Sequence, residues 1–211
     1  MDEKANYARL CCLLVSVGSQ VLRDTFDRII PPSDLLRILK RNPAHSTLQW
    51  LRKEGIVSSV QWSKLYPATP SSVSSTGFGP AFLIVLLRTI CKLSPPLAGW
   101  DAPPHSEDTS READIARVKY FVNVVSGQLR EASMSDAVFS EYWQKIQDTL
   151  VRLGGAGYED VIDEMRNREM NSLDEEHFKE LLRQWKDNED TIKVKLSEVE
   201  SVMRTSGEEG W

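Results

Sequence analysis

The stretch PAFLIVLLRTICKL, residues 80–93, decides the fold. It is apolar on nearly every side of a helix. A helix that is hydrophobic all round is buried among other elements. We therefore expect residues 80–93 to form a central helix that other helices surround. Because Arg88 breaks the run well before the roughly 20 residues that a membrane span needs, no membrane association is expected.

Helical periodicity continues on both sides of this segment. Apolar residues return at three- and four-residue intervals, and no run alternates as a half-buried strand would. The expected helices lie near residues 2–30, 34–42, 46–55, 59–66, 110–126, 136–153, 158–171 and 173–203. The sequence therefore predicts an all-α protein, a helical bundle with a buried central helix and a long C-terminal helix.

Two irregular connections and a charged end organise the chain. Residues 68–79, ATPSSVSSTGFG, are too rich in Ser, Pro, Thr and Gly to pack, and we expect a mobile loop. Residues 94–110 hold four prolines and cannot form a regular helix. From residue 188 the polar face of the last helix is heavily charged. We expect one helical domain over residues 1–187, and a helical extension with a frayed tail over residues 188–211.

The overall charge disfavours one class of function. The 211 residues carry a formal charge of -5, and the pI is about 5.3. Domains that bind nucleic acid by bulk electrostatics are usually basic. The composition therefore argues against that mode of binding, although it leaves a local basic patch open.

Cysteine usage indicates a reducing compartment. Cys11, Cys12 and Cys91 are odd in number and lie inside apolar runs, so they are expected to be buried free thiols. Their spacing and the scattered histidines fit no zinc site, so we expect neither a metal nor another cofactor. The N-terminal sequence fits no signal peptide, and a cytoplasmic location is expected.

A second stretch, KYFVNVVSGQLRE at residues 119–131, carries the functional question. With its surroundings it resembles the HEPN domain (higher eukaryotes and prokaryotes nucleotide-binding), of the type found in the DAZ-interacting zinc-finger (RNA-binding RING) ubiquitin ligase and related invertebrate multidomain proteins. The resemblance spans nearly the whole chain. It is carried by GWDAPP (99–104), DTSREADIARVKYFVNVVSG (108–127), SDAVFSEYWQKIQDTLVRLGG (135–155), RLCCLLVSVGSQVLRDTFD (9–27), LLRTICKLSPP (86–96) and KELLRQWKDNEDTIKVKL (179–196).

The resemblance implies an all-α bundle, often dimeric, whose active members cut RNA without metal. In this subtype the motif reads Arg-Asn, four further residues ending in Gly, then His. Matched to this chain, Val122 stands for the Arg and Gln128 for the His, while Asn123 and Gly127 are kept. The RNA cleavage of active family members would need a side chain that titrates near neutral pH and a guanidinium group that binds the phosphate. A Gln amide and a Val side chain supply neither, so the resemblance implies a degenerate site with no catalytic residue.

Two alternatives remain open at this stage. The run RNPAH, residues 41–45, superficially mimics the motif and could place His45 as a base, although its spacing is shorter and Pro43 interrupts it. Separately, Arg117, Lys119, Asn123 and Arg130 could bind RNA or nucleotide phosphate without cutting. The favoured interpretation is a protein-interaction and assembly module that dimerises within a larger intracellular protein. The alternative is an RNA- or nucleotide-binding module with residual or absent endoribonuclease activity.

Overall fold

The computed structural model describes residues 3–128 and 133–208, with side chains described as far as residue 196. Within these ranges every regular element is helical, as the sequence predicts. The α-helices are α1 (Glu3–Cys12), α2 (Ser19–Ile29), α3 (Pro32–Leu39), α4 (Ala44–Lys53), α5 (Ser59–Leu65), α6 (Pro80–Thr89), α7 (Arg111–Gly127), α8 (Asp136–Gly154), α9 (Glu159–Arg166) and α10 (Ser172–Glu208). A π-helical segment, η1 (Leu13–Gly18), joins α1 to α2, and short 3-10 turns are η2 (Pro70–Ser72), η3 (Ser75–Gly77) and η4 (Ala156–Tyr158).

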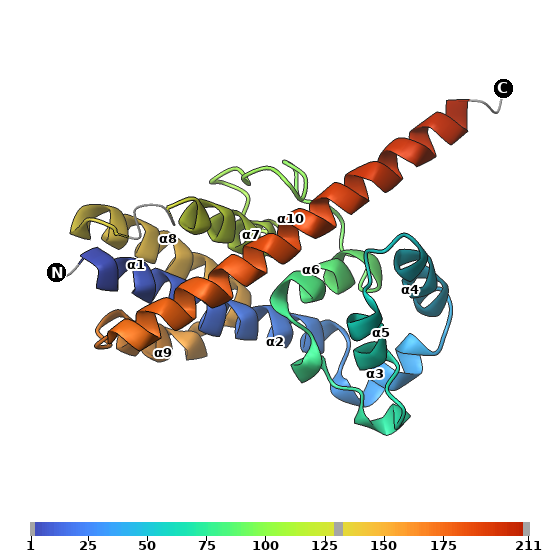
Figure 1. The fold of residues 1–211 in the computed structure, drawn as a ribbon, viewed down its shortest axis with the longest axis horizontal. Helices are drawn as coiled ribbons and strands as arrows, with labels where there is room; N and C mark the ends of the chain where they lie inside the picture. Colours follow the sequence, from blue (N-terminus) through green and yellow to red (C-terminus); the bar gives the residue numbers. More distant parts are fainter. Residues whose placement is uncertain (1–2, 129–132, 209–211) are drawn as a thin grey trace.

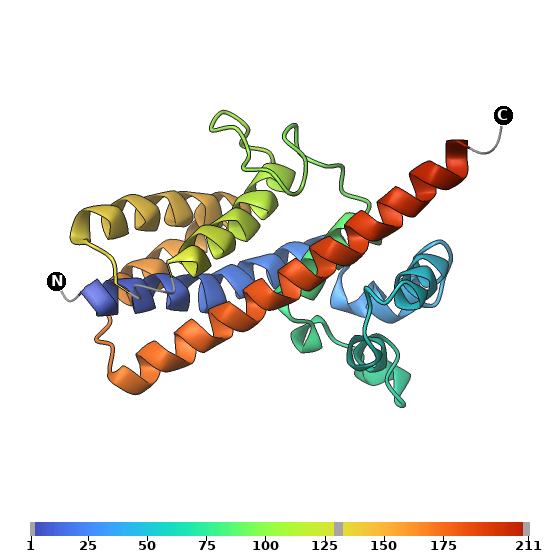
Figure 2. The ribbon, with the colours of Figure 1, turned by 45° about the horizontal axis from the view of Figure 1, so that its top comes forward.

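A long rod formed by α1, η1 and α2 runs through the body (Figure 1). Helices α7 and α8 pack against each other on one side of this rod, while α10 lies along α1. Helices α3, α4 and α5 form a lobe at the far end, and α6 contacts α2 at the junction with that lobe. Figure 2 shows α10 crossing the body obliquely and extending past it.

Helix α6 is buried almost completely, as its sequence predicts. Residues 81–87 are all buried, and Pro80 occupies the first turn, where its missing N–H costs nothing. The helix ends at Thr89 rather than near residue 93, because Lys92 adopts a left-handed backbone with φ 55°. Thus the expected central helix is present but shorter than its apolar run.

The rod of α1, η1 and α2 is strongly apolar and is largely buried. By length and composition alone, the run Glu3–Ile29 could cross a membrane, and 72% of that apolar window is buried inside the protein. Its side chains belong to the main hydrophobic core together with those of α6, α7 and α8. Burial of this kind is the dominant favourable contribution to folding.

The segment expected to be a mobile loop packs over part of its length. Ser75 and Phe78 are buried, and the Phe78 ring meets Phe26 edge to face. The Arg23 guanidinium donates to the carbonyl oxygens of Ser75 and Phe78, at 3.1 and 3.2 Å. The composition of residues 68–79 does not reveal this anchoring, because the partners come from α2.

The C-terminal helix stays on the body beyond residue 188. Glu189 and Ile192 are buried, Leu196 packs against the core, and the Lys195 ammonium donates to the Gly55 carbonyl oxygen. Apolar spacing therefore continues to hold α10 on the body after the point where its charge rises. The extension expected from residue 188 separates from the body only further along the helix (Figure 2).

The three cysteines are free thiols, as expected, and two of them are fully buried. Cys91 is half-buried. Burial raises the pKa of Cys11 and of Cys91 to about 12. The thiolate, which is the reactive form, is therefore scarce at neutral pH.

We expect iodoacetamide to alkylate all three cysteines slowly in the folded protein, and roughly tenfold or more faster after unfolding in guanidinium chloride. Peptide mass spectrometry over a time course would measure each thiol separately. Rapid labelling of Cys11 in folded protein would contradict the burial described here.

Candidate functional site

Helix α7 carries the motif positions, and its start is fixed by local sequence. The Ser110 side chain accepts a hydrogen bond from the Ala113 amide at 3.2 Å and so caps the helix. The helix then runs to Gly127 with Gln128 as its C-terminal cap. Eleven of its 17 residues are buried, because α1, α8 and α10 all contact it.

The two positions that replace the catalytic pair face different environments. Val122 has 0% exposure and belongs to the main core. Gln128 is exposed at the helix end, where its backbone N–H donates to the Val125 carbonyl oxygen at 3.1 Å. The structure therefore does not bring the two side chains together on one surface, and neither of them lines the five main cavities of the part of the chain that the structure describes.

Asn123 lines a very small cavity with Trp100, Asp101, Lys119 and Tyr120 among its neighbours. Its volume is about 20 Å³, which is enough for about one water molecule. A nucleotide base or a phosphate group needs far more space. Asn123 is thus placed in a structural niche beside the loop that precedes α7.

The charge of Lys119 is already engaged inside the protein. The side chain is 7% exposed, donates to the Asp101 carboxylate and lies 3.8 Å from Glu189 of α10. Burial alone would raise the pKa of Asp101, but the hydrogen bond and charge of Lys119 outweigh it and hold that pKa below its usual range. Lys119 therefore ties the preceding loop and α10 to α7.

Glu189 is the buried carboxylate of this group. Burial raises its pKa, although the charge of Lys119 and a hydrogen bond from Trp185 Nε1 at 3.4 Å act in the opposite direction. The folded protein thus holds this proton more tightly than the unfolded chain does. The contribution of Glu189 to stability is complete at low pH and declines as pH rises through the window between its ordinary and its raised pKa.

This linkage gives a pH-dependent prediction. In Glu189→Gln, the slope of the unfolding free energy against pH should become more positive from about pH 4.3 upward, because the proton released on unfolding is no longer there. Urea unfolding at a series of weakly acidic pH values would measure it. Superimposable slopes for the two proteins would show that Glu189 titrates alike in the folded and unfolded states.

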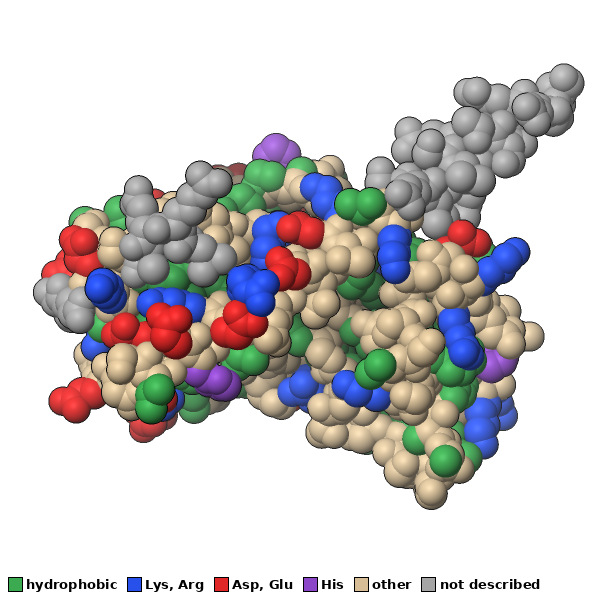
Figure 3. All heavy atoms as spheres, viewed as in Figure 1, with side chains coloured by type: hydrophobic (Ala, Val, Ile, Leu, Met, Phe, Trp, Pro, Cys, Tyr) green, Lys and Arg blue, Asp and Glu red, His purple; other side chains and the backbone are tan. Residues whose placement is uncertain are grey.

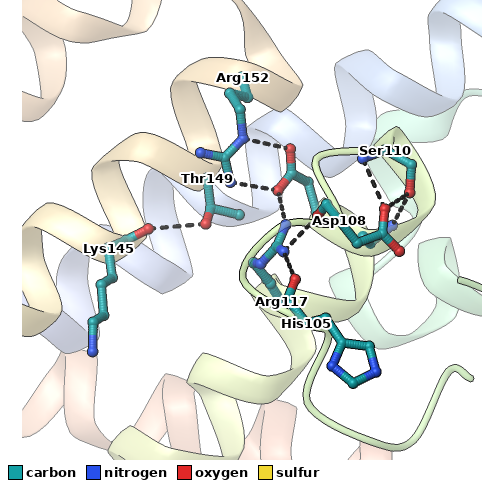
Figure 4. A network of polar contacts seen from close by, with 9 residues as sticks. His105, Asp108, Ser110, Arg117, Lys145, Thr149 and Arg152 are labelled. Atoms are coloured by element: carbon teal, nitrogen blue, oxygen red, sulfur yellow. Dashed lines mark hydrogen bonds and ion pairs between the residues drawn. The ribbon is translucent and has the colours of Figure 1, made fainter. Parts of the chain in front are cut away.

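The guanidinium group of Arg117 has more internal hydrogen-bond acceptors than the ammonium group of Lys119. Its side chain is 10% exposed and donates to Asp114 Oδ1 at 2.7 Å. It also donates to the carbonyl oxygens of His105 and Asp108, so it fastens the proline-rich connection to α7 (Figure 4). Arg152 of α8 reaches the same carboxylate through Nε and Nη2, at 3.1 and 2.7 Å.

The structure therefore gives each proposed phosphate ligand an internal role or leaves it undescribed. Arg117 pairs with the buried Asp114, and Lys119 pairs with the exposed Asp101 and the buried Glu189. Asn123 lines the one-water niche, and Arg130 lies outside the described residues. The functional residues that sequence reasoning missed are Asp114 and Glu189. A signal was present for Asp114, since a carboxylate three residues before an Arg interrupts an otherwise apolar helix face.

His45 also has a structural partner. Its Nδ1 lies 2.9 Å from the Tyr66 hydroxyl, and that hydroxyl donates to the Leu39 carbonyl oxygen at 2.8 Å. Because the hydroxyl proton is used, Nδ1 must carry the hydrogen in this contact. His45 thus joins α4 to the end of α5, within an aromatic group that includes Trp62.

Across the described ranges, no group of three or more His, Cys, Asp or Glu side chains could hold a metal ion. Charged side chains of both signs are interspersed over the body in Figure 3, and the lobe of α3, α4 and α5 shows mainly Lys and Arg.

The all-helical fold and the motif-bearing α7 define a HEPN domain. The profile of the family described as DZIP3/hRUL138-like HEPN matches residues 32–178, and the chain belongs to this family. It is similar to the E3 ubiquitin-protein ligase DZIP3 of Homo sapiens, with 26% identity over 156 residues that cover 73% of this chain and 13% of the relative. The Mus musculus protein of the same name is 25% identical over 175 residues, covering 82% of this chain and 14% of the relative.

The chain thus spans only a small fraction of the curated relatives that it matches. No solved structure matches it.

Proposed function

We propose that this chain is a catalytically degenerate HEPN domain that acts as a protein-interaction and assembly module. The observation that carries the proposal is the packing of Val122, an aliphatic side chain with 0% exposure at the position of the family's Arg. Gln128 offers an amide, which cannot move a proton near neutral pH as His can. The family's metal-free cleavage therefore lacks its acid, its base and its electrophile at this site.

Incubation with single-stranded and structured RNA tests this proposal. We expect no cleavage by the wild-type protein, and none by Asn123→Ala or His45→Ala. Cleavage that Asn123→Ala abolishes would show that the family site is an active centre and would contradict the proposal. Cleavage that His45→Ala abolishes would place the chemistry at the start of α4.

Assembly with a second copy is the interaction that we propose. Helix α10 is 37 residues long, and its C-terminal part leaves the body (Figures 1 and 2). In the sequence, apolar residues continue along this helix at three- and four-residue spacing: Ile192 and Leu196 pack against the body, and Val199 and Met203 follow them. An apolar stripe of this kind is typical of a helix that pairs with another.

Light scattering at high micromolar concentration should give the mass of a dimer. The double variant Val199→Lys with Met203→Lys should shift the mass to that of a monomer, because it places charges in the apolar stripe. Ser201→Lys on the same helix is the matched control and should leave the dimer intact. A monomeric wild-type protein would remove the dimer from the proposal.

RNA or nucleotide binding without cutting is the competing function. It receives little support, because Arg117 and Lys119 are consumed by internal ion pairs. If it were correct, RNA affinity would fall steeply with salt and weaken in Lys119→Met. We further propose that the domain works in a reducing, cytoplasmic setting within a larger protein, consistent with its free thiols and with relatives much longer than this chain.

A further inference from the structure

A second polar cavity lies at the opposite end of α7 from the motif. Its volume is about 280 Å³, and it is formed where the end of α2, the start of α7 and the end of α8 meet. Three arginines and one carboxylate line it, together with two threonines and two apolar residues. These residues are Arg28, Arg111, Arg152, Asp114, Thr25, Thr109, Ile29 and Leu153.

Arg28 brings a charge that no described carboxylate neutralises. Its Nη2 donates to the Thr25 hydroxyl at 3.0 Å and to the Leu153 carbonyl oxygen, both of which are neutral acceptors. Thr25 in turn donates to the Val21 carbonyl oxygen at 2.7 Å, so the hydroxyl is fixed as an acceptor for Arg28. Nε and Nη1 of Arg28 donate to no acceptor within the described ranges.

The other two guanidinium groups also keep unused donors. Arg111 reaches Glu112 through Nη2 at 3.0 Å, and Arg152 uses Nε and Nη2 on Asp114. In both cases Nη1 donates to no described acceptor. Asp114 cannot neutralise this cavity, because it is shared with the buried Arg117 as well as with Arg152.

The cavity is therefore a concentration of positive charge in a chain whose net charge is -5. A phosphomonoester carries about -1.5 to -2 charges at pH 7 and three acceptor oxygens, which matches a cavity lined by three guanidinium groups. Arg is the side chain best suited to such an anion, since its planar fork binds phosphate oxygens in pairs. Ile29 and Leu153 also line the cavity and offer apolar contact to the group that carries the phosphate.

From this geometry we propose that the cavity is a binding site for a phosphate group, either free or as a small phosphomonoester. Arg28 and Arg111 contact the phosphate oxygens, while Arg152 is oriented toward them by Asp114. The site is independent of the degenerate motif and of the dimer proposed above.

Isothermal titration calorimetry in a chloride buffer of low ionic strength tests the site. The probes are inorganic phosphate, phenyl phosphate and AMP, with adenosine as the uncharged counterpart of AMP. We expect binding of at least one phosphate-bearing probe and none of adenosine. A preference for inorganic phosphate indicates the free ion, and a preference for phenyl phosphate or AMP indicates an ester.

Arg28→Gln and Arg111→Gln should each weaken binding roughly tenfold or more, since each removes a charged hydrogen-bond donor. Neither arginine pairs with a buried carboxylate, and urea unfolding of both variants verifies that they fold. Arg37→Gln is the matched control, because Arg37 resembles Arg111 in pairing with one nearby carboxylate on its own helix, Asp34 at 2.8 Å. Absence of binding by all three phosphate probes would overturn the proposal, as would equal affinities in wild-type protein, Arg28→Gln and Arg111→Gln.

Discussion

Replacing Asp114 with alanine should lower the free energy of unfolding by about 3–5 kcal/mol, the usual cost of leaving a buried charge without its partner. The carboxylate is 2% exposed and binds Arg117 and Arg152 at 2.7 Å each. Without it, the guanidinium of Arg117, which is 10% exposed, keeps only the carbonyl oxygens of the preceding loop. Urea unfolding monitored by circular dichroism would measure the loss.

Glu112→Ala is the matched control for this substitution. Glu112 lies in the same first turn of α7 and pairs with Arg111 at 3.0 Å, but that arginine is 48% exposed. Exposed ion pairs contribute about 0–1 kcal/mol, so we expect a small change. Equal losses in Asp114→Ala and Glu112→Ala would show that burial of the Asp114 cluster does not determine its contribution.

The Asp114 cluster also shows where sequence reasoning stops. Apolar composition and spacing were sufficient to predict α6 and α8, and the helices α7 and α8 each begin at a serine, Ser110 or Ser135, whose side chain caps the helix through neighbouring residues. The π-helical turn at Leu13–Gly18 was not predicted, since its buried residues recur at the three- and four-residue spacing of an ordinary helix. Local patterns thus define most helices and few of their irregularities.

The functional assignments depended on partners that are remote in sequence. Arg117 and Lys119 looked available for phosphate because the sequence shows most of their partners far along the chain or in an irregular loop. Apart from Asp114, which pairs with Arg117 on the same helix, their acceptors come from the proline-rich loop and from α10, at His105, Asp101 and Glu189. Sequence spacing identifies which helix carries a charge, but only the tertiary arrangement shows whether that charge is already paired.

The sequence also does not show whether the two motif positions 122 and 128 can accept the residues of the active family members. Putting Arg and His back at these positions tests this. Val122→Arg should lower the free energy of unfolding by about 3–5 kcal/mol, because position 122 has 0% exposure and lies in the main hydrophobic core, where an added charge loses its hydration. Gln128→His, at the exposed helix end, should change it by no more than about 0.5 kcal/mol. The double variant should therefore be unstable and should not cut RNA.

Val138→Arg separates burial from the chemistry of the substitution, since Val138 also lies on a long helix but is 40% exposed. We expect its midpoint in urea to stay close to that of the wild type. If Val122→Arg were equally well tolerated, the arginine would have to reach solvent or a second copy, and the packing of α7 described here would be wrong. If the double variant both folded and cut RNA, two side chains alone would separate this domain from an active ribonuclease, because the rest of the catalytic surface would already be in place.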